Sequence, residues 1–130
     1  MNDVLKRIMH DFGGKLVGNH GLKLHVCEVV SKLPVDLQQY ITKYCWFVGS
    51  MKDAWAYTFT GDDLEDQHLI FLSDDLLHSS SRQIHHSVAH EIGHVVLGHR
   101  NSIFVRQNKR EISKQEKEAD AFAEMYFQRP

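Results

Sequence analysis

The stretch His90-Glu91-Ile92-Gly93-His94-Val95-Val96-Leu97-Gly98-His99 decides how the rest of the sequence is interpreted. It contains His-Glu-x-x-His, the spacing by which an α-helix presents two imidazoles to one zinc ion. At about 100° per residue, His90 and His94 lie one turn apart on the same face of a helix. Glu91 follows one step round that face, within reach of a water on the metal. A general base needs that position.

The surroundings of the motif favour a metal site over a set of hydrogen-bonded core histidines. An unpaired glutamate or histidine would be costly in this strongly apolar stretch. Its apolar residues are Ile84, Val88, Ala89, Ile92, Val95, Val96 and Leu97. Ser80 and Gln83 have the spacing of a capping box, and Gly98 is suited to end a helix. We therefore expect the motif helix to run from Ser80 to about Gly98.

The third ligand is expected to be a downstream carboxylate, because catalytic zinc usually takes three protein ligands and keeps one position open. No histidine follows His99 in the sequence. On a second amphipathic helix, Glu116 lies about 50° from the centre of the apolar arc and Glu118 about 110° from it. Glu116 is therefore favoured, and Glu118 stays its rival. Asp120, one turn after Glu116, is placed to accept a hydrogen bond from a liganding histidine.

Other interpretations of these residues stay open. Ser113 and Glu116 also have the spacing of a capping box, in which Glu116 would serve a helix end. His86 lies one turn before His90 and could be a fourth ligand, but it would close the position that catalysis needs. A core or rim position is favoured for His86. His99 lies about 140° round an ideal helix from His94, which favours a histidine at the helix end.

The rest of the sequence predicts a small α+β domain. Apolar positions at helical spacing predict two helices in the first half of the chain, Asp3–Leu16 (ending at Gly13, Gly14 or Gly18) and Pro34–Tyr44. Alternating or continuous apolar positions predict three strands, Leu22–Val30, Ala54–Phe59 and His68–Leu72, with an acidic turn over 61–67. We expect one domain over residues 1–130, with a small three-stranded, mostly antiparallel sheet packed on the motif helix and the second ligand-bearing helix.

The composition argues against several classes of protein. A hydrophobic content of 42% and a charged content of 25% are ordinary for a soluble globular chain. The net charge of −2 gives no general attraction to nucleic acid or to an anionic membrane. The sequence has no membrane-span pattern and no signal-peptide pattern, so we expect a cytoplasmic protein. Cys27 and Cys45 form no C-x-x-C pair, which favours buried free thiols over a disulfide scaffold.

Residues 68–130 resemble the ImmA/IrrE family of small zinc metallopeptidases, which is gluzincin-like. The resemblance rests on Leu69-Ile-Phe-Leu-Ser, on the motif stretch, and on Glu116-Lys-Glu-Ala-Asp-Ala-Phe-Ala. It implies a zincin-like fold in which Zn²⁺ is held by His90, His94 and Glu116, with Glu91 as the base.

The resemblance also implies a kind of substrate. Members of the family cleave a helix-turn-helix repressor, often one encoded by a phage or mobile element, and so release its target genes. We therefore expect a metalloendopeptidase that acts on such a repressor and does not itself bind nucleic acid. The alternatives are a housekeeping protease, or a zincin-fold module that regulates a repressor or toxin partner by contact with little or no hydrolysis. The intact Glu91 argues against the contact module.

Substrate binding is expected at the strand that precedes the motif helix. Leu69, Ile70 and Phe71 would form a free sheet edge beside the metal, and an extended peptide could pair with that edge through main-chain hydrogen bonds.

Overall fold

The computed structural model describes residues 2–49, 56–59, 67–99 and 109–128, and helices predominate in it. In chain order the elements are α1 (Asp3–Phe12), η1 (Gly13–Lys15), β1 (Leu16–Val17), α2 (His20–Ser31), α3 (Val35–Tyr44), β2 (Cys45–Gly49), β3 (Ala56–Phe59), β4 (His68–Leu72), η3 (Asp74–His78), α4 (Ser81–Val96) and α5 (Lys109–Tyr126). None of the described helices combines the length and the apolar character that crossing a membrane requires.

In the first half of the chain, the two predicted helices are confirmed and one predicted strand is wrong. α1 ends at Gly13 and α3 follows Pro34, as expected. The strand predicted over Leu22–Val30 is wrong, because these residues belong to α2. The alternation of apolar residues there is incidental. The residues that α2 buries recur at helical spacing, and they are Leu22, Val26, Cys27, Val29 and Val30. Asn19 starts the helix by accepting a hydrogen bond from the backbone N–H of Gly21.

The sheet differs from the expected one. Among the described residues it has four strands, in the order β1-β2-β4-β3. β1 pairs with β2 in parallel, β2 pairs with β4 in parallel, and only β3 runs antiparallel to its neighbour β4. The predicted three-stranded, mostly antiparallel sheet is therefore wrong, although the α+β content holds. Parallel pairing of β1 with β2 requires a crossover connection, and α2 and α3 supply it.

The expected free edge at Leu69, Ile70 and Phe71 is also wrong. Leu69 is in register with Trp46 of β2 on one side and with Phe59 of β3 on the other. β4 is thus an interior strand, and its main chain is paired within the sheet. The predicted strand Ala54–Phe59 is present as β3, while its first two residues and most of the acidic turn, 61–66, lie outside the described residues.

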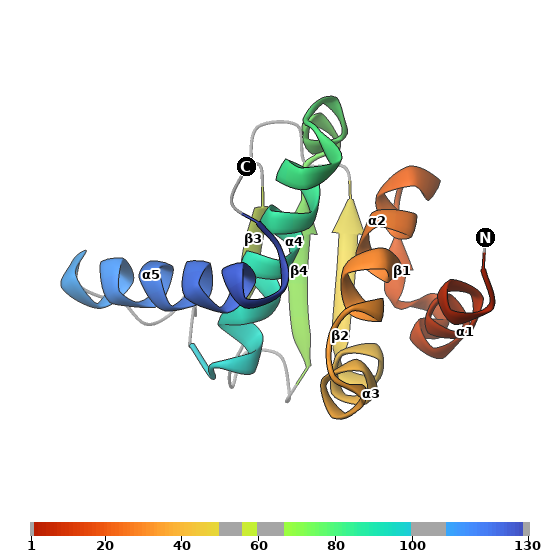
Figure 1. The fold of residues 1–130 in the computed structure, drawn as a ribbon, viewed down its shortest axis with the longest axis horizontal. Helices are drawn as coiled ribbons and strands as arrows, with labels where there is room; N and C mark the ends of the chain where they lie inside the picture. The colour runs from red at the N-terminus through yellow and green to blue at the C-terminus, as the bar shows by residue number, and fades with distance from the viewer. Residues whose placement is uncertain (1, 50–55, 60–66, 100–108, 129–130) are drawn as a thin grey trace.

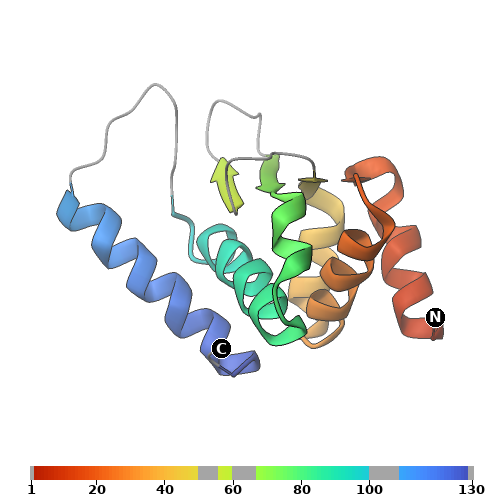
Figure 2. The same cartoon turned by 90° about the horizontal axis from the view of Figure 1, so that it is seen from above.

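The helices lie on one face of the sheet (Figures 1 and 2). Side chains on that face alternate along the strands, with Phe47, Ile70 and Leu72 buried. They pack in one core with buried residues of α2 and α4, such as Val26 and Ile92. Cys27 and Cys45 are buried free thiols, as predicted. Burial raises the pKa of Cys27 to about 11 and that of Cys45 to about 12, so both stay protonated.

Candidate metal centre

α4 carries the His-Glu-x-x-His motif and is fixed at both ends by local hydrogen bonds. The Ser80 hydroxyl accepts a hydrogen bond from the backbone N–H of Gln83, which confirms the predicted start. At the other end, Gly98 adopts a φ of 71°. The N–H of Gly98 donates to the Val95 carbonyl and the N–H of His99 donates to the His94 carbonyl. This is the Schellman pattern, and it reverses the chain directly after the motif.

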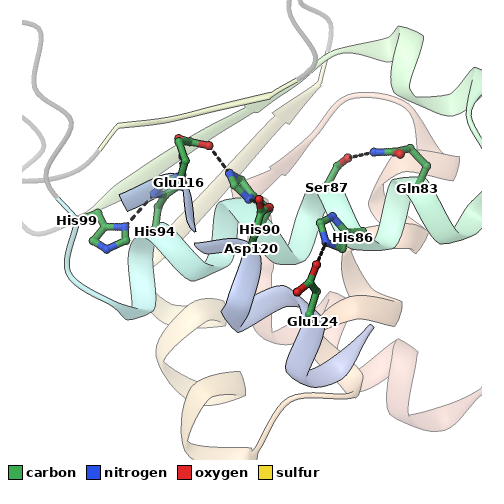
Figure 3. Close-up of polar contacts among 9 residues, drawn as sticks. All are labelled: Gln83, His86, Ser87, His90, His94, His99, Glu116, Asp120 and Glu124. Carbon is green, nitrogen blue, oxygen red and sulfur yellow. Dashed lines mark hydrogen bonds and ion pairs between the residues drawn. The ribbon is translucent and has the colours of Figure 1, made fainter. Parts of the chain in front are cut away.

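α5 crosses α4 at close range, and Gly93 makes that approach possible. A Cβ added to Gly93 would lie 3.1 Å from the carbonyl oxygen of Ala119 and 3.1 Å from a ring carbon of Phe122. Ala119, Phe122 and Ala123 are the buried residues of α5, in agreement with the apolar arc predicted from the sequence. This contact turns the neighbouring carboxylates of α5 toward the histidines of α4 (Figure 3).

His90, His94 and Glu116 come together where the two helices cross. Glu116 Oε2 lies 2.8 Å from His90 Nε2, and Glu116 Oε1 lies 3.1 Å from His94 Nε2. One potential ligand atom from each residue lies within 4.8 Å of the others. Two ligand atoms at about 2.0–2.2 Å from a tetrahedral zinc ion lie about 3.3–3.6 Å apart. Small movements of the three side chains would therefore be enough for them to bind one zinc ion.

The other ring nitrogen of each histidine also has a partner (Figure 3). His90 Nδ1 lies 2.7 Å from Asp120 Oδ1. His94 Nδ1 lies 2.9 Å from His99 Nδ1, and His99 Nε2 lies 3.2 Å from Glu118 Oε1. Glu118, the rival ligand, therefore reaches the cluster only through His99.

The contact between His99 and His94 was not predicted, because the angle between the two residues was taken from one continuous helix. α4 ends at Val96, and the positive φ of Gly98 folds His99 back onto His94. His99 therefore lies at the helix end, as predicted, but it is buried there against His94. Gly98 followed by histidine was the available signal, since a Schellman turn brings its last residue back over the final helical turn. The alternative capping role of Glu116 also fails, because α5 begins at Lys109.

Electrostatics at the site suit a bound cation. His90 faces a carboxylate oxygen at each ring nitrogen, whereas a neutral imidazole has only one N–H to donate. A second proton or a metal ion must satisfy the other contact. Burial lowers the pKa of His94 and outweighs the opposing effect of Glu116, which favours the neutral ring that metals bind.

Glu91 and His86 occupy other positions along α4. Glu91 is only 8% exposed although it carries a carboxylate, and it lies on the helix between the two motif histidines. His86 Nε2 is buried, lies 4.0 Å from Glu124 Oε1, and makes no hydrogen bond with any of the described residues. The structure groups His86 with Glu124 instead of with the three-residue cluster (Figure 3).

A comparison with protein families found a match to the part of the chain that contains the cluster. The model of the family Peptidase U49 matches residues 82–128, the segment that contains α4 and α5. Neither the curated proteins nor the solved structures yielded a match. The chain is thus similar to a peptidase family over the helix pair that forms the cluster. The match supports a peptidase but gives no specific support to the ImmA/IrrE family.

Proposed function

We propose that this protein is a zinc-dependent endopeptidase. The observation that carries the proposal is the convergence of His90, His94 and Glu116 at the α4–α5 crossing, within a segment similar to a peptidase family. Two imidazoles and one carboxylate are a ligand set used by catalytic zinc, and they leave a position for a reactant. When bound, zinc would acidify a water molecule and polarise the scissile carbonyl.

Glu91 is proposed as the general base. It lies next to His90 on a helix and is almost completely buried. A general base must lie beside the metal-bound water, and the residue after the first histidine of His-Glu-x-x-His has that position. Glu91 would take the proton of the attacking water and pass it to the nitrogen of the leaving amine.

Asp120 and His99 are proposed to orient the two motif histidines. Asp120 accepts the N–H of His90 Nδ1, which directs the lone pair of Nε2 toward Glu116. The contact between His99 and His94 would fix the second ring in the same way, with Glu118 holding His99.

Peptide binding is proposed beside β3 instead of β4. β3 is the outermost described strand on one side of the sheet and it contacts α4. An extended peptide that pairs with a sheet edge is held through its main chain, as an endopeptidase requires. Main-chain pairing is weakly selective, so the choice of substrate would come from contacts elsewhere on the protein.

For the substrate, we propose a helix-turn-helix repressor, on the basis of the resemblance of residues 68–130. The test is incubation of the zinc-loaded protein with the repressor encoded beside its gene, followed by intact-mass analysis. A single cut that Glu91→Gln abolishes is expected. An uncut repressor together with digestion of unrelated unfolded proteins would refute the repressor substrate but keep the peptidase. Tight binding of the repressor without any cut would favour the contact module.

A further inference from the structure

A second cluster of potential metal ligands lies where α2 meets α4. His25 and Glu28 come from α2, and His85 comes from α4. His85 Nε2 lies 3.0 Å from Glu28 Oε2 and 3.2 Å from His25 Nδ1. His25 Nδ1 lies 3.9 Å from Glu28 Oε2. The three atoms therefore form a small triangle with edges of 3.0, 3.2 and 3.9 Å.

Helix geometry produces this cluster and separates it from the first one. His25 and Glu28 are three positions apart, so they share one face of α2. His85 lies five positions before His90, which places it about 140° away around α4. α2 packs against α4, which brings the three side chains together (Figure 1). The ring of Phe127 lies 5.8 Å from the ring of His85.

The hydrogen-bonding capacity of these side chains does not match their arrangement well. Three groups that can each present a lone pair point at one another. If only one of the two facing ring nitrogens carries a proton, that proton has to serve two acceptors. A cation at the centre would satisfy all three. The edges of the triangle bracket the roughly 3.3–3.6 Å that separates neighbouring ligands of a tetrahedral zinc ion.

We propose that His25, Glu28 and His85 bind a second divalent transition-metal ion, of which Zn²⁺ is the best-matched example. Two imidazole nitrogens and a carboxylate oxygen are ligands that this ion accepts. The side chains of His25, Glu28 and His85 are 21%, 39% and 16% exposed, so the ion can enter from solvent and keep a water ligand. The bound ion would join α2 to α4 and thereby hold the motif helix against the core.

The charges around this cluster set how tightly it binds. Burial lowers the pKa of His85, and the charge of Glu28 opposes that shift, while His25 and Lys32 add to it. The ammonium of Lys32 lies 5.6 Å from the centre of the Phe127 ring, and that ring lies 5.8 Å from the ring of His85. Lys32 disfavours a cation and Glu28 favours one. We therefore expect Lys32 to reduce the affinity of this site for zinc.

The proposal does not depend on peptidase activity, and its test needs only metal-free protein and Zn²⁺. Equilibrium dialysis should give two zinc ions per wild-type chain and one for either Glu28→Gln or His85→Ala. Glu28→Gln replaces a single carboxylate oxygen on a partly exposed side chain. This variant should therefore fold even if His85→Ala does not. His10→Ala is the matched control, because His10 is an exposed helical histidine outside both clusters, and it should keep two ions.

A second measurement isolates the new site. In a Glu116→Ala background, added Zn²⁺ should still raise the melting temperature, since an ion that binds the folded state stabilises it. Adding Glu28→Gln should abolish that rise. An unchanged zinc count in both Glu28→Gln and His85→Ala would overturn the proposal. A count that falls in Glu28→Gln but not in Glu116→Ala would support this site and refute the peptidase site instead.

Discussion

The Nδ1 atom of His90 lies 2.7 Å from the Oδ1 atom of Asp120, and this contact orients a side chain of the motif helix from the neighbouring helix. A histidine that ligates a metal is commonly fixed in this way, and loss of the partner typically weakens metal binding about 10–100-fold. Asp120→Asn should therefore retain the site but lower its zinc affinity by that factor. Competition with a chelator of known affinity measures the change. Asp36→Asn, on an exposed position of α3, should leave the affinity unaltered.

Glu116 and Glu118 are two positions apart, but only Glu116 contacts both motif histidines. Glu116→Ala should remove the zinc ion of this site. Glu118→Ala should keep the ion with weaker affinity, because Glu118 holds His99, which contacts His94. Metal analysis of the two variants distinguishes these residues. Loss of zinc from Glu118→Ala alone would show that the ligand assignment is mistaken.

Glu91→Gln should separate metal binding from catalysis. The substitution removes the base and keeps the shape of the side chain and all three ligands. General acid–base groups typically contribute about 10²–10⁴-fold to the rate. The rate of cleavage should therefore fall by at least about 10²-fold. Zinc content and circular dichroism should match the wild type. Cleavage at a near wild-type rate would place the base on another residue.

Gly93→Ala should disturb the site from a distance. The added Cβ meets the backbone of Ala119 and the ring of Phe122, and such overpacking costs about 1–3 kcal/mol. Alanine regains up to about 1 kcal/mol of helix propensity, so we expect a net loss of about 1 kcal/mol in the free energy of unfolding. Zinc affinity should fall with it, because α5 moves away from α4.

Urea denaturation with and without zinc measures both effects of Gly93→Ala. Gly14→Ala is the matched control, since a Cβ at Gly14 meets nothing among the described residues within 4 Å. The free energy of unfolding of Gly14→Ala should not show the loss expected for Gly93→Ala, and its zinc affinity should equal that of the wild type. Equal behaviour of the two variants would contradict the proposed role of the helix crossing.

Local features of the site could be predicted from the sequence, because they depend on helix periodicity. The spacing of His90 and His94 and the inward side of α5 follow from 3.6 residues per turn. These regularities selected Glu116 over Glu118, and the structure places Glu116 against both histidines. The predicted helix start at Ser80 and the reversal at Gly98 depend on equally local capping chemistry.

Features that depend on distant parts of the chain could not be predicted in this way. The two residues of β1 and the five of β2 are too short for a clear pattern, and their pairing joins segments that are separated by two helices. Because α2 was predicted as a strand, a group of potential metal ligands was not recognised from the sequence. On a strand, His25 and Glu28 would point to opposite faces, so their grouping with His85 was invisible until the helix was recognised.

The most direct test of the metal site is a crystal structure of the zinc-loaded protein with anomalous diffraction data collected at the zinc edge. We predict an anomalous peak about 2.0–2.2 Å from the Nε2 atoms of His90 and His94 and from a carboxylate oxygen of Glu116. Glu118 should lie beyond bonding distance of that peak. The absence of a peak at these three side chains in the zinc-loaded crystal, or a peak bound by Glu118 in place of Glu116, would contradict the account.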